Sequence, residues 1–123
     1  MSTTTIVVAG AGPTGLALAC GLRGAGQAVR VVDKAEGPSA TSRALGLQPR
    51  GSEVLDRLGA LADLPQQSVH IGQVITHVNG ELMARLEVGR RTELVTRPGL
   101  IISQAEVEAR LRHRLRDLGA ADK

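Results

Sequence analysis

Aromatic side chains are missing from this sequence: its 123 residues include no Phe, Tyr or Trp. A core must therefore be built from aliphatic side chains, and no ring can stack on a nucleic-acid base, so single-strand binding is disfavoured. Long hydrophobic runs are missing as well, because Arg23 and Arg30 interrupt the longest apolar stretch. That stretch is too short for the ~20 residues that span a bilayer, so we expect no membrane partner.

Cysteine is also scarce, since Cys20 is the only one. We expect Cys20 to be a small buried hydrophobe, because a single thiol cannot form an internal disulfide framework. Residues 1–4 carry no charged lead-in of the kind that begins a signal peptide. Together these features favour a cytoplasmic protein.

Charge is slightly positive, with 15 basic and 12 acidic residues, which suits an anionic ligand. Four of the basic residues crowd the last helical segment: Arg110, Arg112, Arg114 and Arg116. Alternate positions on a helix point in different directions, and acidic residues are interspersed among these arginines. We therefore interpret them as a solvated helix face and expect no nucleic-acid partner.

A strand, a glycine-rich turn, a helix and a second strand are expected in succession from Thr5 to Asp33. The turn between the first strand and the helix contains Gly10, Ala11, Gly12, Pro13, Thr14 and Gly15. Its first glycine permits a tight turn, the second lets a pyrophosphate approach the main chain, and the third lets the helix pack closely on the sheet. The free N–H groups at the helix start would face the anion.

Asp33 ends the second strand, where a carboxylate can accept hydrogen bonds from both ribose hydroxyls of a dinucleotide. The same negative charge would repel a 2′-phosphate, which disfavours NADP as the ligand of this turn. With its flanking strands, helix and terminal acid, the glycine motif predicts an adenine-dinucleotide site.

The remainder of the chain predicts further helices and one hairpin. A helix is expected from about Arg50 or Ser52 to Leu61, with Val54, Leu55, Leu58 and Leu61 on its apolar face. Residues 69–88 have strand character around Asn79-Gly80, the strongest short hairpin signal, and their alternation predicts that Arg85 and Glu87 lie on the wetter face. Residues 103–106, Ser-Gln-Ala-Glu, form a capping box, and we expect their helix to end at Gly119.

Three blocks of the sequence resemble one family: VVAGAGPTGLALACGLRGAGQAVRVVDK, SRALGLQPRGSEVLDRLG and ISQAEVEARLRHRLRDLGA. They are similar to the N-terminal part of the class A flavoprotein monooxygenases, FAD-dependent aromatic hydroxylases related to p-hydroxybenzoate hydroxylase and the bacterial polyketide hydroxylases. The resemblance covers residues 5–121. It implies an α/β fold, with a Rossmann-like FAD-binding βαβ unit, further helices and an appended antiparallel hairpin.

The resemblance also implies roles for individual residues. The turn from Gly10 to Gly15 would hold the FAD pyrophosphate, and Asp33 the adenosine ribose. Lys34 would lie near the adenine or its ribose, Arg43 would approach the pyrophosphate and flavin side, and Gln104 would reach the FAD. Each of the last three has an ordinary alternative, because a loop cation or a first-turn glutamine needs no ligand.

Three histidines, His70, His77 and His113, lack the spacing of a metal site or a catalytic base, and we assign them to structure or surface. We name no catalytic residue and no metal ligand.

The chain ends before the family's later Asp-Gly and Gly-Asp motifs and its substrate layer. We therefore expect residues 1–123 to form one domain, the truncated N-terminal part of an FAD-binding domain and incomplete relative to the family. The complete enzyme would use NAD(P)H and O2 to hydroxylate an aromatic or polyketide substrate. The alternative is a non-catalytic dinucleotide-binding or interaction module. Missing strands leave sheet edges exposed, so we also expect a homodimer or a complementing chain.

Overall fold

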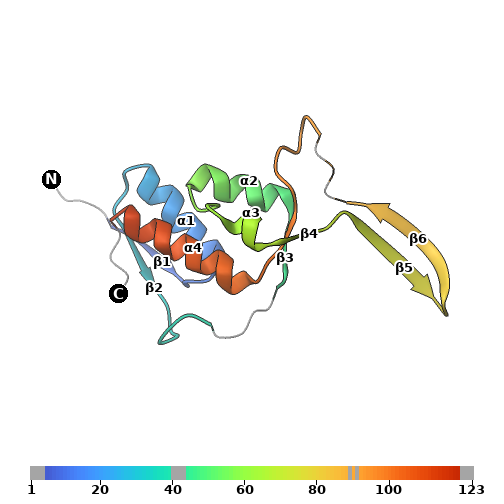
Figure 1. Ribbon diagram of the computed structural model, residues 1–123. Helices are drawn as coiled ribbons and strands as arrows, with labels where there is room; N and C mark the ends of the chain where they lie inside the picture. The colour runs from blue at the N-terminus through green and yellow to red at the C-terminus, as the bar shows by residue number, and fades with distance from the viewer. Residues whose placement is uncertain (1–4, 40–43, 89, 91, 120–123) are drawn as a thin grey trace.

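A computed structural model describes residues 5–39, 44–88, 90 and 92–119. Two helices, α1 (Pro13–Gly24) and α4 (Gln104–Asp117), lie side by side over a short parallel strand pair, and a long hairpin extends away from this body (Figure 1). The predicted α/β class is confirmed. Its two parts, a parallel βαβ unit and an antiparallel hairpin, are both present.

The βαβ unit consists of β1 (Ile6–Ala9), α1 (Pro13–Gly24) and β2 (Val29–Val32). The two strands pair in parallel, with Ile6 opposite Val29 and Ala9 opposite Val32. A helical crossover between adjacent strands requires this orientation, as the sequence predicted. Because the register brings both strands to an end together, the glycine turn and Asp33 lie at the same edge of the sheet.

An aliphatic core lies between α1 and α4 (Gln104–Asp117). Leu16 and Cys20 of α1, and Leu111 and Leu115 of α4, are each at most 2% exposed. Cys20 donates a hydrogen bond from Sγ to the Leu111 carbonyl at 3.4 Å, and burial raises the pKa of this thiol. The prediction that Cys20 is a buried core residue is confirmed. The core therefore fixes α4 against the helix that begins at the glycine turn.

Helix α2 (Pro49–Leu58) ends earlier than the sequence predicted. Gly59 adopts a left-handed conformation with φ of 72°, and the chain then turns into the short helix α3 (Leu64–Gln67). The predicted end at Leu61 is wrong because a glycine in this conformation terminates a helix. Leu61 is buried all the same, whereas Val54 is 41% exposed and does not belong to the apolar face.

A three-stranded antiparallel sheet was not predicted. It consists of β3 (Gly46–Leu47), β7 (Leu100–Ile101) and β4 (Val69–His70), with β7 in the middle. Each of these strands has two residues, too few to produce an alternating pattern. Strand β3 begins shortly after Ala44, and β7 ends shortly before α4. Beside this sheet, the Gln104 N–H at the start of α4 donates to the Ala44 carbonyl at 3.0 Å.

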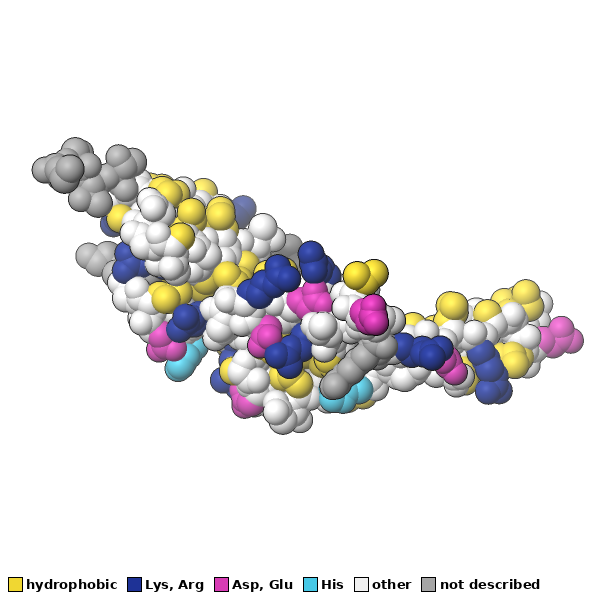
Figure 2. All heavy atoms as spheres, turned by 90° about the horizontal axis from the view of Figure 1, so that it is seen from above, with side chains coloured by type: hydrophobic (Ala, Val, Ile, Leu, Met, Phe, Trp, Pro, Cys, Tyr) yellow, Lys and Arg dark blue, Asp and Glu magenta, His cyan; other side chains and the backbone are white. Residues whose placement is uncertain are grey.

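The hairpin of β5 (Gln73–Val78) and β6 (Glu81–Glu87) turns at Asn79 and Gly80, as predicted. Both turn residues have positive φ, 51° and 82°, which matches the favoured two-residue hairpin turn. The expected division into a dry and a wet face is wrong, because every residue of both strands is exposed. Hydrophobic side chains accordingly lie on the surface of the hairpin (Figure 2).

Candidate cofactor site

The glycine turn joins β1 to α1 with little room between main-chain segments. Gly10 has φ of 106°, a conformation that favours glycine, and donates its N–H to the Val32 carbonyl at 2.7 Å. A Cβ on Gly15 would lie 2.0 Å from the Gly10 carbonyl oxygen, so only glycine fits there. The predicted reasons for these two glycines, a tight turn and close helix packing, are confirmed.

Gly12 has the opposite surroundings. It caps the N-terminus of α1 in an extended conformation, and its carbonyl accepts from the Leu16 N–H at 2.9 Å. A Cβ built on Gly12 would have no atom of the described residues within 4 Å. Packing within this part of the chain therefore does not require a glycine here. The open space beside the main chain is room that a ligand can occupy.

A groove of about 540 Å³ opens beside the turn. It is bounded by the turn, the end of β2 with the segment that follows, and one side of α4. Its lining residues are Ala11, Gly12, Val31, Asp33, Ala35, Glu36, Gly37, Pro38, Ser39, Gln104, Glu108, Arg112 and Arg116. Four of the sequence-predicted positions, Ala11, Gly12, Asp33 and Gln104, thus meet in one groove although they come from three separate segments of the chain.

Asp33 is held at the groove by two main-chain donors. Its Oδ2 accepts from the Ala11 N–H at 2.6 Å, and its Oδ1 accepts from the Ala35 N–H at 2.8 Å. These bonds, the Ala11 bond first, hold the pKa of the Asp33 carboxyl below its usual range, with smaller help from the positive charges of Arg112 and Lys34. The acid is therefore ionised and oriented.

A polar row along α4 faces the same groove, and two of its residues, Glu108 and Arg112, were not predicted from the sequence. Gln104 donates from Nε2 to Oε1 of Glu108 at 2.8 Å, and Glu108 Oε2 lies 3.9 Å from Arg112 Nη2. Arg112 in turn donates to the Ala11 carbonyl at 2.9 Å. The spacing of four residues from Gln104 to Glu108 to Arg112 was the available signal, because such positions share one helix face.

The interpretation of the α4 arginines as a solvated face is wrong for two of them. Arg112 binds the Ala11 carbonyl of the glycine turn, and Arg114 donates from Nε to the Leu58 carbonyl at the end of α2 (2.9 Å). A cation is favourable at the C-terminal end of a helix, which explains the second contact. Arg110 forms an ion pair with Asp63 at 2.6 Å. On the face shown in Figure 2, basic and acidic side chains are interspersed and do not form a patch of one sign.

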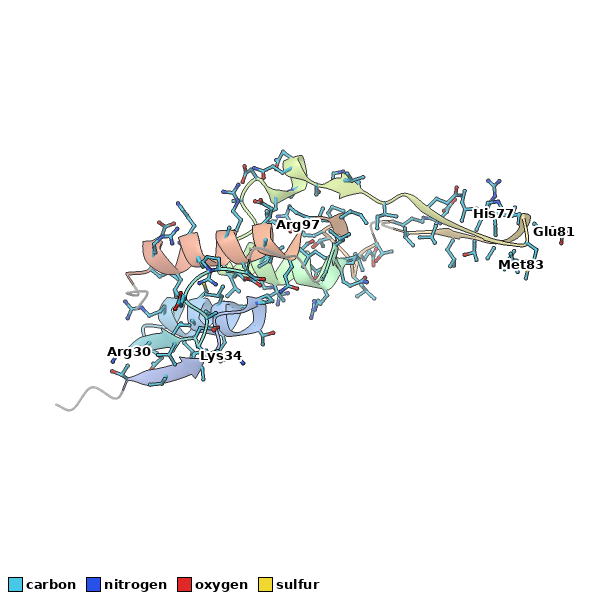
Figure 3. All side chains as sticks on the ribbon, turned by 90° about the horizontal axis from the view of Figure 1, so that it is seen from below. Arg30, Lys34, His77, Glu81, Met83 and Arg97 are labelled. Carbon is cyan, nitrogen blue, oxygen red and sulfur yellow. The ribbon has the colours of Figure 1, made fainter. Side chains whose placement is uncertain are left out.

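Other predicted site residues lie apart from the groove. Lys34 follows β2 (Figure 3) and lines a second hollow of about 440 Å³ with Gly10 and Asp33. Among the described residues, neither hollow is lined by Pro13, Thr14 or Gly15, which form the first turn of α1. Arg43 lies outside the described residues.

The three histidines are exposed, and His113 pairs with Asp117 at 3.3 Å. In the described segments, no three His, Cys, Asp or Glu side chains gather as a metal site would require. Likewise, none of the helices described here has both the length and the apolar character to cross a membrane.

A parallel βαβ unit with a glycine turn, a helix start and an acid at the end of the second strand defines a dinucleotide-binding protein. The family model of the FAD-binding domain matches residues 3–122. The chain belongs to this family, and its dinucleotide is FAD.

Several proteins similar to this chain are named as oxygenases or monooxygenases. The chain is 35% identical over 115 residues to 6-methylpretetramide 4-monooxygenase of Streptomyces rimosus, covering 93% of this chain and 21% of that protein. Its fold matches 2-methyl-3-hydroxypyridine-5-carboxylic acid oxygenase in its tetrameric form with a TM-score of 0.84, at 27% identity, over 100% of this chain and 32% of that one.

A third match is p-nitrophenol 4-monooxygenase of Pseudomonas putida, with a TM-score of 0.79 at 33% identity over 93% of this chain and 30% of that chain. The chain thus spans between a fifth and a third of these proteins.

Proposed function

We propose that the groove between the glycine turn and α4 binds the ADP half of FAD. The observation that supports this most directly is the open space beside Gly12, at the start of α1, next to the ionised Asp33. N–H groups at the helix start suit the pyrophosphate, and Asp33 retains acceptor capacity for ribose hydroxyls because each carboxylate oxygen has two lone pairs. Gln104 contributes its amide from α4.

Lys34 keeps its proposed role near the adenine or its ribose, and Arg43 keeps its proposed role at the pyrophosphate and flavin side. Lys34 lines a hollow that shares Asp33 with the groove, which supports a contact close to the ligand of this acid.

The complete protein is proposed to be a monooxygenase that hydroxylates an aromatic or polyketide substrate with NAD(P)H and O2. The names of the relatives support this, since they include a pretetramide and a p-nitrophenol monooxygenase. FAD supplies the redox chemistry when bound. The residues of this chain bind the cofactor and orient it, and none of them is assigned a proton-transfer step.

Calorimetric titration of the chain with FAD, NAD and ADP tests the proposed site. FAD should bind most tightly, and Asp33→Ala should weaken all three because each carries an adenosine ribose. Absence of FAD binding by the wild-type chain would overturn the proposal. Equal affinity for all three ligands would instead favour the non-catalytic nucleotide module, because only the ADP half would then be recognised.

We further propose that the chain associates with a second copy through β6. The strand has an open edge and exposed apolar side chains, and one relative forms a tetramer. The hairpin register skips Met83, because Thr76 pairs with Ala84 and His77 with Leu82. The proposed pairing therefore relies on the backbone groups and apolar side chains of the open β6 edge, and a charge placed on an edge strand opposes such pairing.

Sedimentation velocity tests this interface. Leu86→Lys should dissociate the dimer, whereas Val74→Lys on β5 should leave it intact. A monomer at every concentration, or a dimer indifferent to Leu86→Lys, would contradict the interface.

A further inference from the structure

Within the described structure, Ala11 is the one residue of the glycine turn whose N–H and carbonyl are both bound by side chains from elsewhere in the chain. Its N–H donates to Asp33 Oδ2 at 2.6 Å, and its carbonyl accepts from Arg112 Nη2 at 2.9 Å. Both bonds involve an ionised side chain, which makes them stronger than neutral hydrogen bonds. The peptide planes on both sides of Ala11 are therefore fixed from outside the turn.

The carbonyl bond has a direct consequence for the next residue. The peptide bonds of the described residues are trans, so the Gly12 N–H points opposite to the Ala11 carbonyl across the same rigid plane. By binding this carbonyl, Arg112 sets the direction of the Gly12 N–H. Gly12 lines the groove and has open space beside it, so this direction matters to any anion bound there.

Arg112 is itself held in place. Glu108, whose exposure is only 6%, lies one helical turn before it on α4, with 3.9 Å between Oε2 and Nη2. The other Glu108 oxygen accepts from Gln104 at 2.8 Å. A carboxylate buried to this degree is costly unless its charge and lone pairs are matched, and here a cation and an amide match them. The row therefore has a defined geometry rather than the freedom of a surface arginine.

We propose that Arg112 is a positioning residue for the FAD pyrophosphate, and that Glu108 orients it. The inference rests on the proposed function, because it concerns the same groove. Arg112 acts through the Ala11–Gly12 peptide and places a positive charge beside the groove. Its effect should therefore be confined to ligands with phosphate groups. An ordinary structural tie between α4 and the turn would instead alter stability and the binding of every ligand alike.

The test compares Arg112→Met, which keeps the aliphatic stem but removes the guanidinium, with the matched control Arg110→Met. Arg110 is on the same helix and is 30% exposed, but it pairs with Asp63 and lies away from the groove. Affinities for FAD and ADP are measured by calorimetry and for adenosine by NMR titration, with thermal melts of each unliganded variant. Arg112→Lys, which retains the charge and N–H donors but loses the planar guanidinium, serves as the rescue.

Arg112→Met should weaken FAD and ADP about tenfold or more, the loss expected from one charge-assisted hydrogen bond. Adenosine affinity should stay within about twofold, since adenosine carries no phosphate. Arg112→Lys should recover part of the loss, and Arg110→Met should bind all three ligands like the wild type.

Two results would overturn the inference: unchanged FAD affinity in Arg112→Met, or a loss of adenosine affinity equal to the loss of FAD affinity. Neither result would overturn the proposed site as long as the wild-type chain binds FAD. If the wild-type chain binds no FAD, the proposed function fails first. If Arg112→Met does not fold, Glu108→Gln decides. This isosteric change keeps the bond to Gln104 and removes the charge that faces Arg112, so it should weaken FAD but not adenosine, and unchanged FAD affinity would refute the proposal.

Discussion

Replacing Gly15 with alanine sets two effects of opposite sign against each other. Gly15 lies in the first turn of α1, where alanine would be favoured over glycine by about 1 kcal/mol of helix propensity. The added Cβ, however, would lie 2.0 Å from the Gly10 carbonyl oxygen and 3.1 Å from its carbon. These are main-chain atoms of a residue whose N–H is bonded to Val32, so they cannot rotate away as a flexible side chain could.

The clash should therefore be the larger effect. Overpacking costs about 1–3 kcal/mol in general, and a backbone contact this short belongs at the upper end. After the gain in helix propensity, Gly15→Ala should lower the free energy of unfolding by about 2 kcal/mol. For a chain of this size that corresponds to a fall in Tm of roughly 8 °C.

Gly21→Ala is the matched control, because it adds the same methyl group to the same helix. There the nearest atom, Leu58 Cδ2, would lie at an ordinary contact distance of 3.7 Å. Thermal and urea unfolding followed by circular dichroism should show Gly21→Ala about 0.5–1 kcal/mol more stable than the wild type. A Gly15→Ala variant whose Tm equals or exceeds that of the wild type would refute the close approach of α1 to the turn.

Three further substitutions test the turn, the acid and the helix cap. Gly12→Ala should leave the free energy of unfolding within about 1 kcal/mol of the wild type, because a lost glycine cap and a less flexible unfolded chain offset each other. It should nevertheless raise the Kd for FAD in calorimetry, and an unchanged Kd would argue against pyrophosphate contact at this residue.

Asp33 has a folded-state pKa below its unfolded value, so its stabilising contribution is present above about pH 4 and is lost as pH falls through the lowered folded pKa. Asp33→Asn should flatten the acid side of the stability profile, and a profile like that of the wild type would contradict this assignment. Ser103→Ala should cost about 1 kcal/mol in urea unfolding, because Oγ accepts from the Ala105 N–H at 3.2 Å, whereas Ser103→Asp should retain the cap. Equal urea midpoints for wild type and Ser103→Ala would show that the cap is not needed.

The sequence predicted best what depends on local chemistry. The βαβ unit, the turn at Asn79-Gly80 and the cap at Ser103 each follow from residues that are close in the chain, and all three are present. The strands of the β3–β7–β4 sheet have two residues each, so pairing between distant segments alone creates them. The end of α2 had a local signal in Gly59, but the apolar spacing that continued to Leu61 outweighed it.

The candidate site divides in the same way. Gly12 and Asp33 belong to one contiguous motif, and the sequence placed both at the expected groove. Arg112 could not be found by that route, because its partner, the Ala11 carbonyl, lies 101 positions earlier in the chain. Its role depends on how α4 packs on α1, and charge patterning along α4 alone favoured exposure to solvent instead.

The hairpin has a consequence for how unfolding of this chain should be measured. Its strands extend from the body (Figure 3), and all their residues are exposed. The backbone hydrogen bonds between β5 and β6 can therefore open without disturbing the aliphatic core around Leu16 and Leu115. In the monomer, hydrogen exchange should therefore separate fast amides in β5 and β6 from slow amides in α1 and α4. A single free energy of unfolding describes the core and not the whole chain.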